Sequence, residues 1–339
     1  MTLKPFRRLA VAAGLSLVAT VPLHAQQAGV DKITMAYPGF AFSLADVFVG
    51  TDLGLWAKHG LEAKEVMIAG IGSINAVISG SVEFAEASAL SMTRAAAKGQ
   101  RLLIIASLHN RPMVQVSLRK EVAEAAGVTA ITPFDKRGVA LKGHVVVVDT
   151  INSIVHAYVR LLAIRAGVDP DDVKIAPMQP LDMLAAYEKH QVDGLAQTLP
   201  WPMKPVQEGT AVMLGDGPLG EPSDMTPFSN TVVVTKPETC EQKPALCMKV
   251  GQVFAEIVDI IKDRPADALA VFKKRFDTLD AKLVESSFEE VRAGTARPPV
   301  TSTEALRHAE QFNVEAGLMK KDEMLTSYDG LFTDKYVKH

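Results

Sequence analysis

The chain has 339 residues, of which 48% are hydrophobic and 6% aromatic, and its 36 lysines and arginines stand against 39 aspartates and glutamates, a formal net charge of −3. A mildly acidic chain without a basic stripe is a poor candidate for binding nucleic acids, because such binding depends on lysine and arginine neutralising phosphates. The length is sufficient for two domains that each bury a core of their own.

The start of the chain is typical of an export signal. Basic residues at Lys4, Arg7 and Arg8 precede an apolar run, 9–21, that is too short to span a bilayer, and Ala25 offers a cleavage point. We expect residues 1–25 to be a signal peptide, with a cut after Ala28 as the alternative. The mature protein is then expected in the periplasm, without stable membrane insertion.

Strands and helices alternate in the first part of the mature chain. Strands are predicted where apolar residues alternate or run together, and helices where they recur every three or four residues. The predicted strands are 31–37, 61–69, 82–88 and 102–108, and the predicted helices are 42–60, 72–80 and 90–100. Such βαβ units form parallel sheets, and the continuous apolar run at 102–108 suits a strand covered on both faces.

The alternation then begins again. Further strands are predicted at 114–120, 140–149, 173–178, 192–198, 211–217 and 229–236, and helices at 153–167, at 181–191 and from Pro244 to the end of the chain. A loop is expected between 120 and 140, and another at 215–228, which is rich in glycine and proline.

Two successive βαβ sets predict an α/β protein with two lobes around a cleft, the kind of place where small molecules bind. Two crossover strands, near 113–119 and 229–236, would connect the lobes and form a hinge. The first lobe is expected to comprise residues 30–115 plus 230–339, including the C-terminal helices, and the second lobe residues 116–229.

Two cysteines are present, Cys240 and Cys247. In an oxidising, exported compartment an isolated pair seven residues apart favours one small-loop disulfide. A metal site would need further ligands, and no histidine is near in the sequence. We therefore expect a disulfide and no metal.

The loop Gly70-Ile71-Gly72-Ser73-Ile74-Asn75 nearly spells a dinucleotide-binding fingerprint, but Asn75 stands where the third glycine belongs. No cofactor is expected. Gly70 and Gly72 would still let the backbone approach a ligand closely, and Ser73 is placed to cap the following helix, whose N-terminus favours an anion or a polar oxygen. An ordinary strand-to-helix turn is the alternative.

Several turns that follow predicted strands should converge at one edge of the sheets, where open α/β folds bind ligands. These turns are 37–43, 70–73, 88–91, 109–112, 149–153 and 198–201. They are rich in serine, threonine, asparagine and glycine, and Tyr37, Phe40, Phe42 and Trp201 would supply aromatic walls.

Arg111 carries the one positive charge in these turns, and two interpretations stay open. It would clamp a carboxylate or sulfonate through paired N–H donors, or it would be a solvated arginine paired with a neighbouring acid. The histidines do not form a catalytic or metal-binding pattern, so no catalytic residues are expected.

The order of these segments resembles the nitrate/sulfonate/taurine-type substrate-binding proteins of ABC importers. The resemblance lies in ADVFVGTDLGLWAKHGLEAKEVMIAGIGSINAVISGSVEFAEAS and in LKGHVVVVDTINSIVHAYVRLLAIRAGVDPDDVKIAPM, and it covers roughly residues 31–215. It implies the periplasmic binding protein type II fold, whose two lobes close on a solute.

Carried over by position, the resemblance implies a set of ligand-facing residues: Tyr37, Phe40, Phe42, Gly70, Gly72, Ser73, Ser88, Leu90, Thr150, Asn152, Ser153 and Trp201. The chain departs from the family at Asn152-Ser153, where relatives often carry Gly-Ser. It also departs at Thr198-Leu199-Pro200, where many relatives carry Trp-Glu-Pro. The missing glutamate removes a partner for an amine and favours anionic or neutral ligands.

The expected function is therefore that of an exported, monomeric solute-binding protein that captures a small organic anion, a carboxylate or sulfonate, and delivers it to the membrane permease of an ABC importer. An alternative is the binding component of a TRAP-type carrier or of a sensor system. An enzyme on the same fold is the third interpretation.

Overall fold

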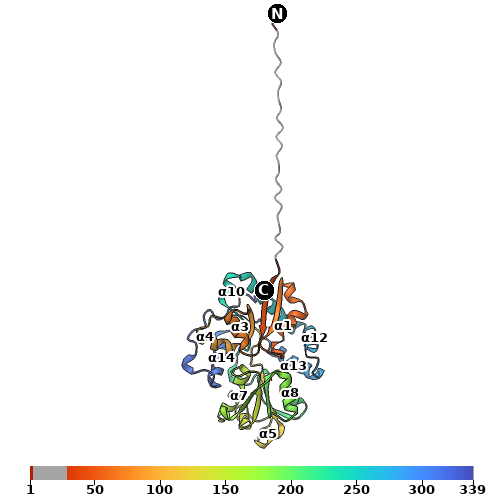
Figure 1. The fold of residues 1–339 in the computed structure, drawn as a ribbon, viewed down its shortest axis with the longest axis vertical. Helices are drawn as coiled ribbons and strands as arrows, with labels where there is room; N and C mark the ends of the chain where they lie inside the picture. Colours follow the sequence, from red (N-terminus) through yellow and green to blue (C-terminus); the bar gives the residue numbers. More distant parts are fainter. Residues whose placement is uncertain (3–28, 339) are drawn as a thin grey trace.

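The computed structural model describes residues 1–2 and 29–338, so the expected signal peptide lies outside the described residues from residue 3 onward. The chain forms two lobes, and its colours in Figure 1 pass from orange in the upper lobe through green in the lower lobe and back to blue in the upper lobe.

The upper, or first, lobe is built on a five-stranded sheet with the order β2-β1-β3-β10-β4. The strands are β1 (Asp31–Tyr37), β2 (Leu61–Met67), β3 (Phe84–Ser88), β4 (Leu103–Ser107) and β10 (Thr231–Thr235). β1 is parallel to β2 and β3, whereas β10 runs antiparallel between β3 and β4.

The lower, or second, lobe has a sheet of the same design, with the order β7-β6-β8-β5-β9. Its strands are β5 (Val114–Arg119), β6 (Val145–Val148), β7 (Lys174–Pro177), β8 (Gly194–Thr198) and β9 (Ala211–Asp216). β6 is parallel to β7 and β8, and β5 runs antiparallel between β8 and β9.

The chain therefore crosses between the sheets twice, from β4 to β5 and from β9 to β10. In the first sheet the strand that follows the second lobe, β10, lies antiparallel between β3 and β4. In the second sheet the strand that follows the first lobe, β5, lies antiparallel between β8 and β9. The predicted α/β class with two crossover strands is confirmed. We keep residues 30–115 plus 230–339 and 116–229 as the proposed limits of the two lobes.

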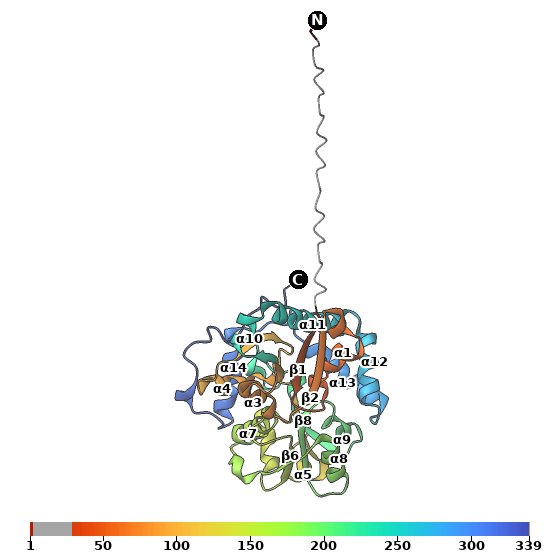
Figure 2. The same cartoon turned by 45° about the horizontal axis from the view of Figure 1, so that its top comes forward.

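Helices connect the parallel strands and pack on the sheets (Figures 1 and 2). In chain order they are α1 (Asp46–Asp52), α2 (Leu55–Lys58), α3 (Gly72–Ser79), α4 (Ala89–Ala97), α5 (Lys120–Ala125), α6 (Phe134–Arg137), α7 (Ile154–Arg165), α8 (Pro180–Glu188), α9 (Met203–Gln207), α10 (Pro237–Gln242), α11 (Pro244–Asp263), α12 (Pro265–Arg275), α13 (Ala281–Gly294) and α14 (Thr303–Glu315). Within the described ranges, none of them is both long and apolar enough to cross a membrane.

Three segments differ from the sequence expectation. The helix predicted over 42–60 is divided into α1 and α2 because Gly54 adopts a left-handed conformation with φ of 69°. The segment expected to be a loop after residue 120 contains α5 and α6. The helical tail ends at Glu315, and Gly317, with φ of 69°, turns the chain into an irregular final segment.

The predicted disulfide is present and links Cys240 in α10 to Cys247 in α11, with the two Cα atoms 5.5 Å apart. Both cysteines are buried, and Cys247 packs in the same core as Val250 and Phe254 of α11. The bridge therefore fixes α10 against the long helix that covers the first sheet.

Candidate functional site

A small polar cavity lies between the two lobes, with a volume of about 40 Å³. Both sheets contribute to it, and its walls are formed by Pro38, Ser43, Leu44, Gly70, Ser88, Ser91, Asp149, Ser153, Ile154, Val155, Gln197, Thr198, Asn230 and Thr231. The space has room for the centres of only a few water-sized groups. The lobes are therefore close together, and the cavity is the candidate ligand site.

Five of the six turns predicted to converge contribute residues to these walls, all except 109–112. Gly70, Ser88 and Ser153 are the members of the predicted ligand set that line the cavity directly. The reason is the one used in the sequence analysis: parallel strands end at the same edge of their sheet, and the turns that follow them meet there.

Serine caps two helices at the cavity. The hydroxyl oxygen of Ser88 accepts a hydrogen bond from the amide of Ser91 at 3.2 Å, at the start of α4. The hydroxyl oxygen of Ser153 accepts one from the amide of His156, also at 3.2 Å, at the start of α7. The positive ends of two helix dipoles thus point toward the cavity and favour negative charge or polar oxygen there.

Two buried hydroxyl groups on the cavity wall lack a hydrogen-bond partner among the described residues. They are Oγ of Ser43, from the first lobe, and Oγ1 of Thr198, from the second, whose side chains are 0% and 4% exposed. An unsatisfied buried hydroxyl costs about 1–3 kcal/mol. The two residues belong to different lobes and both line the cavity, an arrangement that suits a polar ligand.

Asp149 is the acidic member of the wall. It follows β6 directly, and the hydroxyl of Ser153 donates a hydrogen bond to its Oδ1. Burial raises the pKa of Asp149 to about 6, while the hydrogen bonds from Ser153 and the backbone of Thr150 act in the opposite direction. The carboxyl group is therefore held in position by its own loop.

Gly70 and Thr150 bring the lobes into close contact beside the cavity. Gly70 has φ of 52°, and a β-carbon placed on it would lie 2.0 Å from Oγ1 of Thr150. Only glycine permits this approach, which gives Gly70 the role expected of it. Thr150 lies on the opposite side of the contact rather than on the cavity wall.

The expected cap of α3 is different. The helix begins at Gly72, its N-cap is Ile71, and no side chain caps it. Ser73 is buried in the first turn, where its hydroxyl donates a hydrogen bond to the carbonyl of Gly70 at 3.2 Å. Ser73 therefore supports the glycine loop from within the first turn of α3, because the N-cap lies two residues before the position that the sequence suggested.

The predicted aromatic walls form a seam between the lobes, and none of them lines the cavity. The indole N–H of Trp201 donates to the carbonyl of Phe40 at 2.8 Å, and the amide of Phe42 donates to the carbonyl of Leu199 at 2.8 Å. Phe40 also stacks on Phe276, with ring centroids 4.3 Å apart. We call these five residues the aromatic seam.

The aromatic seam is largely buried, with Phe40 half-buried. Trp201 and Phe42 are fully buried, and Phe42 packs edge-on against Phe272 and Phe276. Tyr37 lies at the margin of this region, edge-on to Phe48 at 5.3 Å. The aromatic residues were expected to face a ligand, and they pack against one another because the turn 37–43 of the first lobe meets the turn after β8 of the second.

Arg111 lies away from the cavity. Its Nη1 donates to the carbonyl of Pro218 at 2.9 Å, so its hydrogen-bond partner is a backbone carbonyl and not a carboxylate. The physical reason is the insertion of β10 between β3 and β4, which places β4 and its turn 109–112 at the edge of the sheet.

Leu90 and Asn152 also lie off the wall. The side chain of Leu90 is fully buried, and its carbonyl accepts from Nδ2 of Asn313 at 3.0 Å. Asn152 is exposed, with φ of 65°, and its amide donates to Nδ1 of His156 at 3.0 Å.

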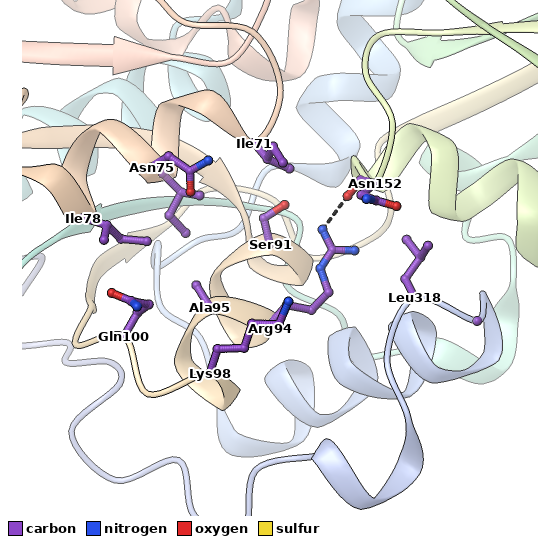
Figure 3. Close-up of a pocket in the computed structure, with 12 residues that line it drawn as sticks. Ile71, Asn75, Ile78, Ser91, Arg94, Ala95, Lys98, Gln100, Asn152 and Leu318 are labelled. Carbon is purple, nitrogen blue, oxygen red and sulfur yellow. Dashed lines mark hydrogen bonds between the residues drawn. The ribbon is translucent and has the colours of Figure 1, made fainter.

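An open groove of about 500 Å³ adjoins the cavity and shares Ser91 with it. Figure 3 shows the groove, with Arg94 reaching from α4 toward Asn152 of the second lobe. The guanidinium donates to the carbonyl of Asn152 and, at 3.1 Å, to Oδ1 of Asn313. We call this the outer groove, and Arg94 of its lining bridges the lobes through the carbonyl of Asn152.

Buried ionisable groups lie beneath the first-lobe wall. Burial raises the pKa of Asp46 to about 7, and burial together with the charge of Asp46 raises that of Glu86 well above its ordinary value. Glu86 is two residues before Ser88 on β3, so both point to the same face of the strand. No group of three or more acidic, histidine or cysteine side chains in the described chain is arranged to hold a metal ion.

The polar residues at the start of the inserted strand β10 were not predicted from the sequence. β10 is antiparallel to β3, so its first residue, Thr231, is paired with the last residue of β3, Ser88, and Asn230 precedes it. Both line the cavity. The signal was available, because the polar pair Asn230-Thr231 stands immediately before the apolar run 232–234, but its use requires knowing that the strand is inserted antiparallel.

Residues 41–268 match the family model described as NMT1/THI5 like. No curated protein sequence matches the chain. Solved structures show the same fold: a protein from Bordetella bronchiseptica superposes with a TM-score of 0.78 at 16% identity, covering 90% of this chain and 95% of that one.

Two further structures have functional names. The alkanesulfonate-binding protein SsuA of Xanthomonas axonopodis pv. citri, bound to MOPS, gives a TM-score of 0.70 at 15% identity and covers 90% and 100% of the two chains. The periplasmic nitrate-binding protein NrtA of Synechocystis gives 0.64 at 13% identity and covers 91% and 87%. At such identities the likeness establishes the fold, and the expected periplasmic binding protein fold is confirmed.

Proposed function

The chain belongs to the NMT1/THI5-like family, and from this premise we propose that it is an exported solute-binding protein whose lobes close over a small organic solute and present it to the membrane permease of an ABC importer. A periplasmic location and a monomeric state are parts of the same proposal. The alkanesulfonate- and nitrate-binding proteins of the same fold support it by analogy.

The observation that carries the proposal is the pair of unpartnered hydroxyls, Ser43 and Thr198, on opposite walls of the interlobe cavity. Each comes from a different lobe, so a ligand that bonded both would join the lobes. Because such a ligand would bind the closed state more tightly than the open one, its binding would shift the population toward closure.

We propose that the solute carries an acidic or strongly polar oxygen group, as in a carboxylate or sulfonate. The starts of α4 and α7 face the cavity, and Ile154 and Val155, in the first turn of α7, are on its wall. The amides of Ile154 and Val155 precede the capped amide of His156, have no acceptor within their own helix and would donate to such a group. Arg111 has no part in this scheme, because it bonds Pro218.

We propose binding rather than catalysis. The described residues on the cavity wall include no histidine, cysteine or lysine, which are common nucleophiles and general bases of enzymes. The outer groove, lined by Arg94 and Lys98, would be the path by which the solute enters before the lobes close.

A thermal-shift screen of the purified mature protein against carboxylates, sulfonates, nitrate and amines tests the proposal. At 100 times its Kd, a ligand adds about 2.7 kcal/mol to the free energy of unfolding, which raises the Tm by several degrees for a chain of this size. We expect one or more organic acids to do so without being consumed. Turnover of a bound compound, or stabilisation by none of them, would contradict the proposal.

A variant with a β-branched side chain at Gly70 provides the control. A compound that acts by lobe closure should stabilise the wild type and lose its effect on Gly70→Val, because the added side chain would overlap Thr150. A compound that raises the Tm of both proteins equally binds elsewhere.

A further inference from the structure

We propose that Asp149 makes the cavity selective for solutes that bring a hydrogen-bond donor, an ammonium, N–H or O–H group, to its carboxylate, and that the cavity discriminates against fully ionised anions without such a group. The inference rests on the proposed function and names a narrower class of solute for the same site.

The charge distribution on the cavity wall is the first argument. Asp149 is its one ionisable side chain among the described residues, and no lysine, arginine or histidine lines the cavity. No ion pair within the described structure involves Asp149. A carboxylate only accepts hydrogen bonds, so the acceptor positions of Asp149 that Ser153 and the backbone of Thr150 leave open favour a donor from the ligand.

The groups around the Asp149 carboxyl hold it in place without supplying a positive charge to neutralise it. The hydroxyl of Ser153 donates to Oδ1, and the same hydroxyl oxygen accepts from the amide of His156. The hydroxyl proton of Ser153 therefore already makes a hydrogen bond to Asp149 and is not available to the solute. Ser153 acts on the solute through Asp149, as a positioning residue.

The basic side chain of Arg94, on the adjoining groove, already has hydrogen-bond partners. The guanidinium of Arg94 donates to the carbonyl of Asn152 and to Oδ1 of Asn313. Beneath the first-lobe wall the buried groups are again acids, Asp46 and Glu86, and no cation pairs with either in the described chain. The cavity thus offers an anionic solute helix N-termini and hydroxyls, but no opposing positive side chain.

Taken together, these contacts favour a solute with two kinds of polar end. One end would present oxygens to the first turn of α7 and to the hydroxyls of Ser43 and Thr198, and the other would donate to Asp149. Amino acids, aminosulfonates, hydroxy acids and amides satisfy this description, whereas simple alkyl carboxylates, alkylsulfonates and nitrate do not.

The test uses compounds in pairs of nearly equal shape that differ in one donor group. Suitable pairs are β-alanine with butyrate, 2-aminoethanesulfonate with propanesulfonate, lactate with isobutyrate, and the corresponding pairs of each compound that the thermal-shift screen identifies. Calorimetry on the wild type should give the donor-bearing member at least a tenfold lower Kd. This comparison needs no variant and cannot fail through misfolding.

Asp149→Asn then assigns the preference to the residue. The amide has the same shape and also donates, so the ratio of the two Kd values should fall at least tenfold, toward one. Asp182→Asn, a change at an exposed aspartate in the first turn of α8, should leave the ratio unchanged.

The outcomes separate the two levels of the proposal. If compounds bind but the donor-free members bind as tightly as their partners, the role of Asp149 is overturned and the solute-binding function stands. A ratio that Asp149→Asn does not change overturns it as well. If no compound in the enlarged panel binds the wild type, the proposed function itself fails, and the inference fails with it.

Discussion

Two regions hold the lobes against each other, and they differ in how their polar groups are satisfied. In the aromatic seam, the indole N–H of Trp201 and the amide of Phe42 both reach carbonyls of the opposite lobe at 2.8 Å, and the rings around them are buried. At the cavity, Ser43 and Thr198 present hydroxyls that nothing in the described chain satisfies. The seam is complete in itself, whereas the cavity wall is incomplete.

The difference indicates that the aromatic seam and the cavity wall have separate roles in lobe closure. A seam whose groups are paired stabilises closure whether or not a solute is present. A wall with unpaired groups gains that stabilisation only when a ligand supplies the missing partners. The seam would therefore bring the lobes close to closure, and binding of the solute would determine whether the closed state is favoured. The following variants act on one region at a time.

The largest effect is expected where the lobes touch beside the cavity. Gly70→Val should weaken solute binding at least a hundredfold, about 2.7 kcal/mol, because even a β-carbon would lie 2.0 Å from Oγ1 of Thr150. Gly99→Val is the matched control: Gly99 also has positive φ, 80°, but has open space around it. Calorimetry that found equal losses for both variants would attribute the effect to backbone strain and not to blocked closure.

A smaller effect is expected from the aromatic seam. Trp201→Phe removes the hydrogen bond to Phe40 and part of the buried ring, and we expect about a tenfold weaker affinity, about 1.4 kcal/mol. Trp56→Phe serves as the control, because its indole N–H bonds Thr51 within the first lobe at 3.1 Å. That variant should lose stability in urea without a change in Kd, and an equal loss of affinity in both would show that the seam has no special part in closure.

The cavity wall itself predicts two changes of opposite sign. Thr198→Val removes an unpaired hydroxyl, so the free protein should gain up to about 1 kcal/mol in unfolding free energy while solute binding weakens about fivefold.

Thr231→Val removes a hydroxyl that accepts from Nδ2 of Asn230 and donates to the carbonyl of Ser43, so the free protein should lose about 1–2 kcal/mol in unfolding free energy. Urea unfolding without solute distinguishes them, and destabilisation by both would mean that Thr198 is satisfied in solution.

The smallest effect is expected at Arg111. Its contact with the carbonyl of Pro218 places it in neither region, so Arg111→Ala should change the affinity for an anionic solute by no more than about twofold. The sequence left a ligand clamp open as one of two interpretations of Arg111, and a clamp predicts a larger loss of affinity. Calorimetry decides between the two, and a tenfold loss would mean that the guanidinium reaches the solute in the bound state.

The elements of the fold were predictable because their signals are local. Apolar alternation and short continuous apolar runs identified all of the strands β1 to β10, and the rule that ligands bind beyond the ends of parallel strands led to Gly70, Ser88 and Ser153. The rule says which turns converge, and it needs no knowledge of which side chains meet.

The remainder depends on contacts between distant segments. Nothing in the turn 37–43 shows that Phe40 and Phe42 will meet Trp201 and Leu199 of the other lobe and be withdrawn from the ligand site. The insertion of β10 has two consequences that sequence periodicity does not contain: it brings Asn230 and Thr231 to the cavity, and it moves Arg111 away from it.

The central claim is that a solute is enclosed at the cavity and joins the two lobes. A crystal structure of the protein with the compound that raises the Tm most tests it directly. We predict the compound between the lobes, within hydrogen-bond distance of Ser43 and Thr198, with the contact of Gly70 and Thr150 intact. A compound found in the outer groove or on the surface, with the cavity still closed and empty, would contradict the account.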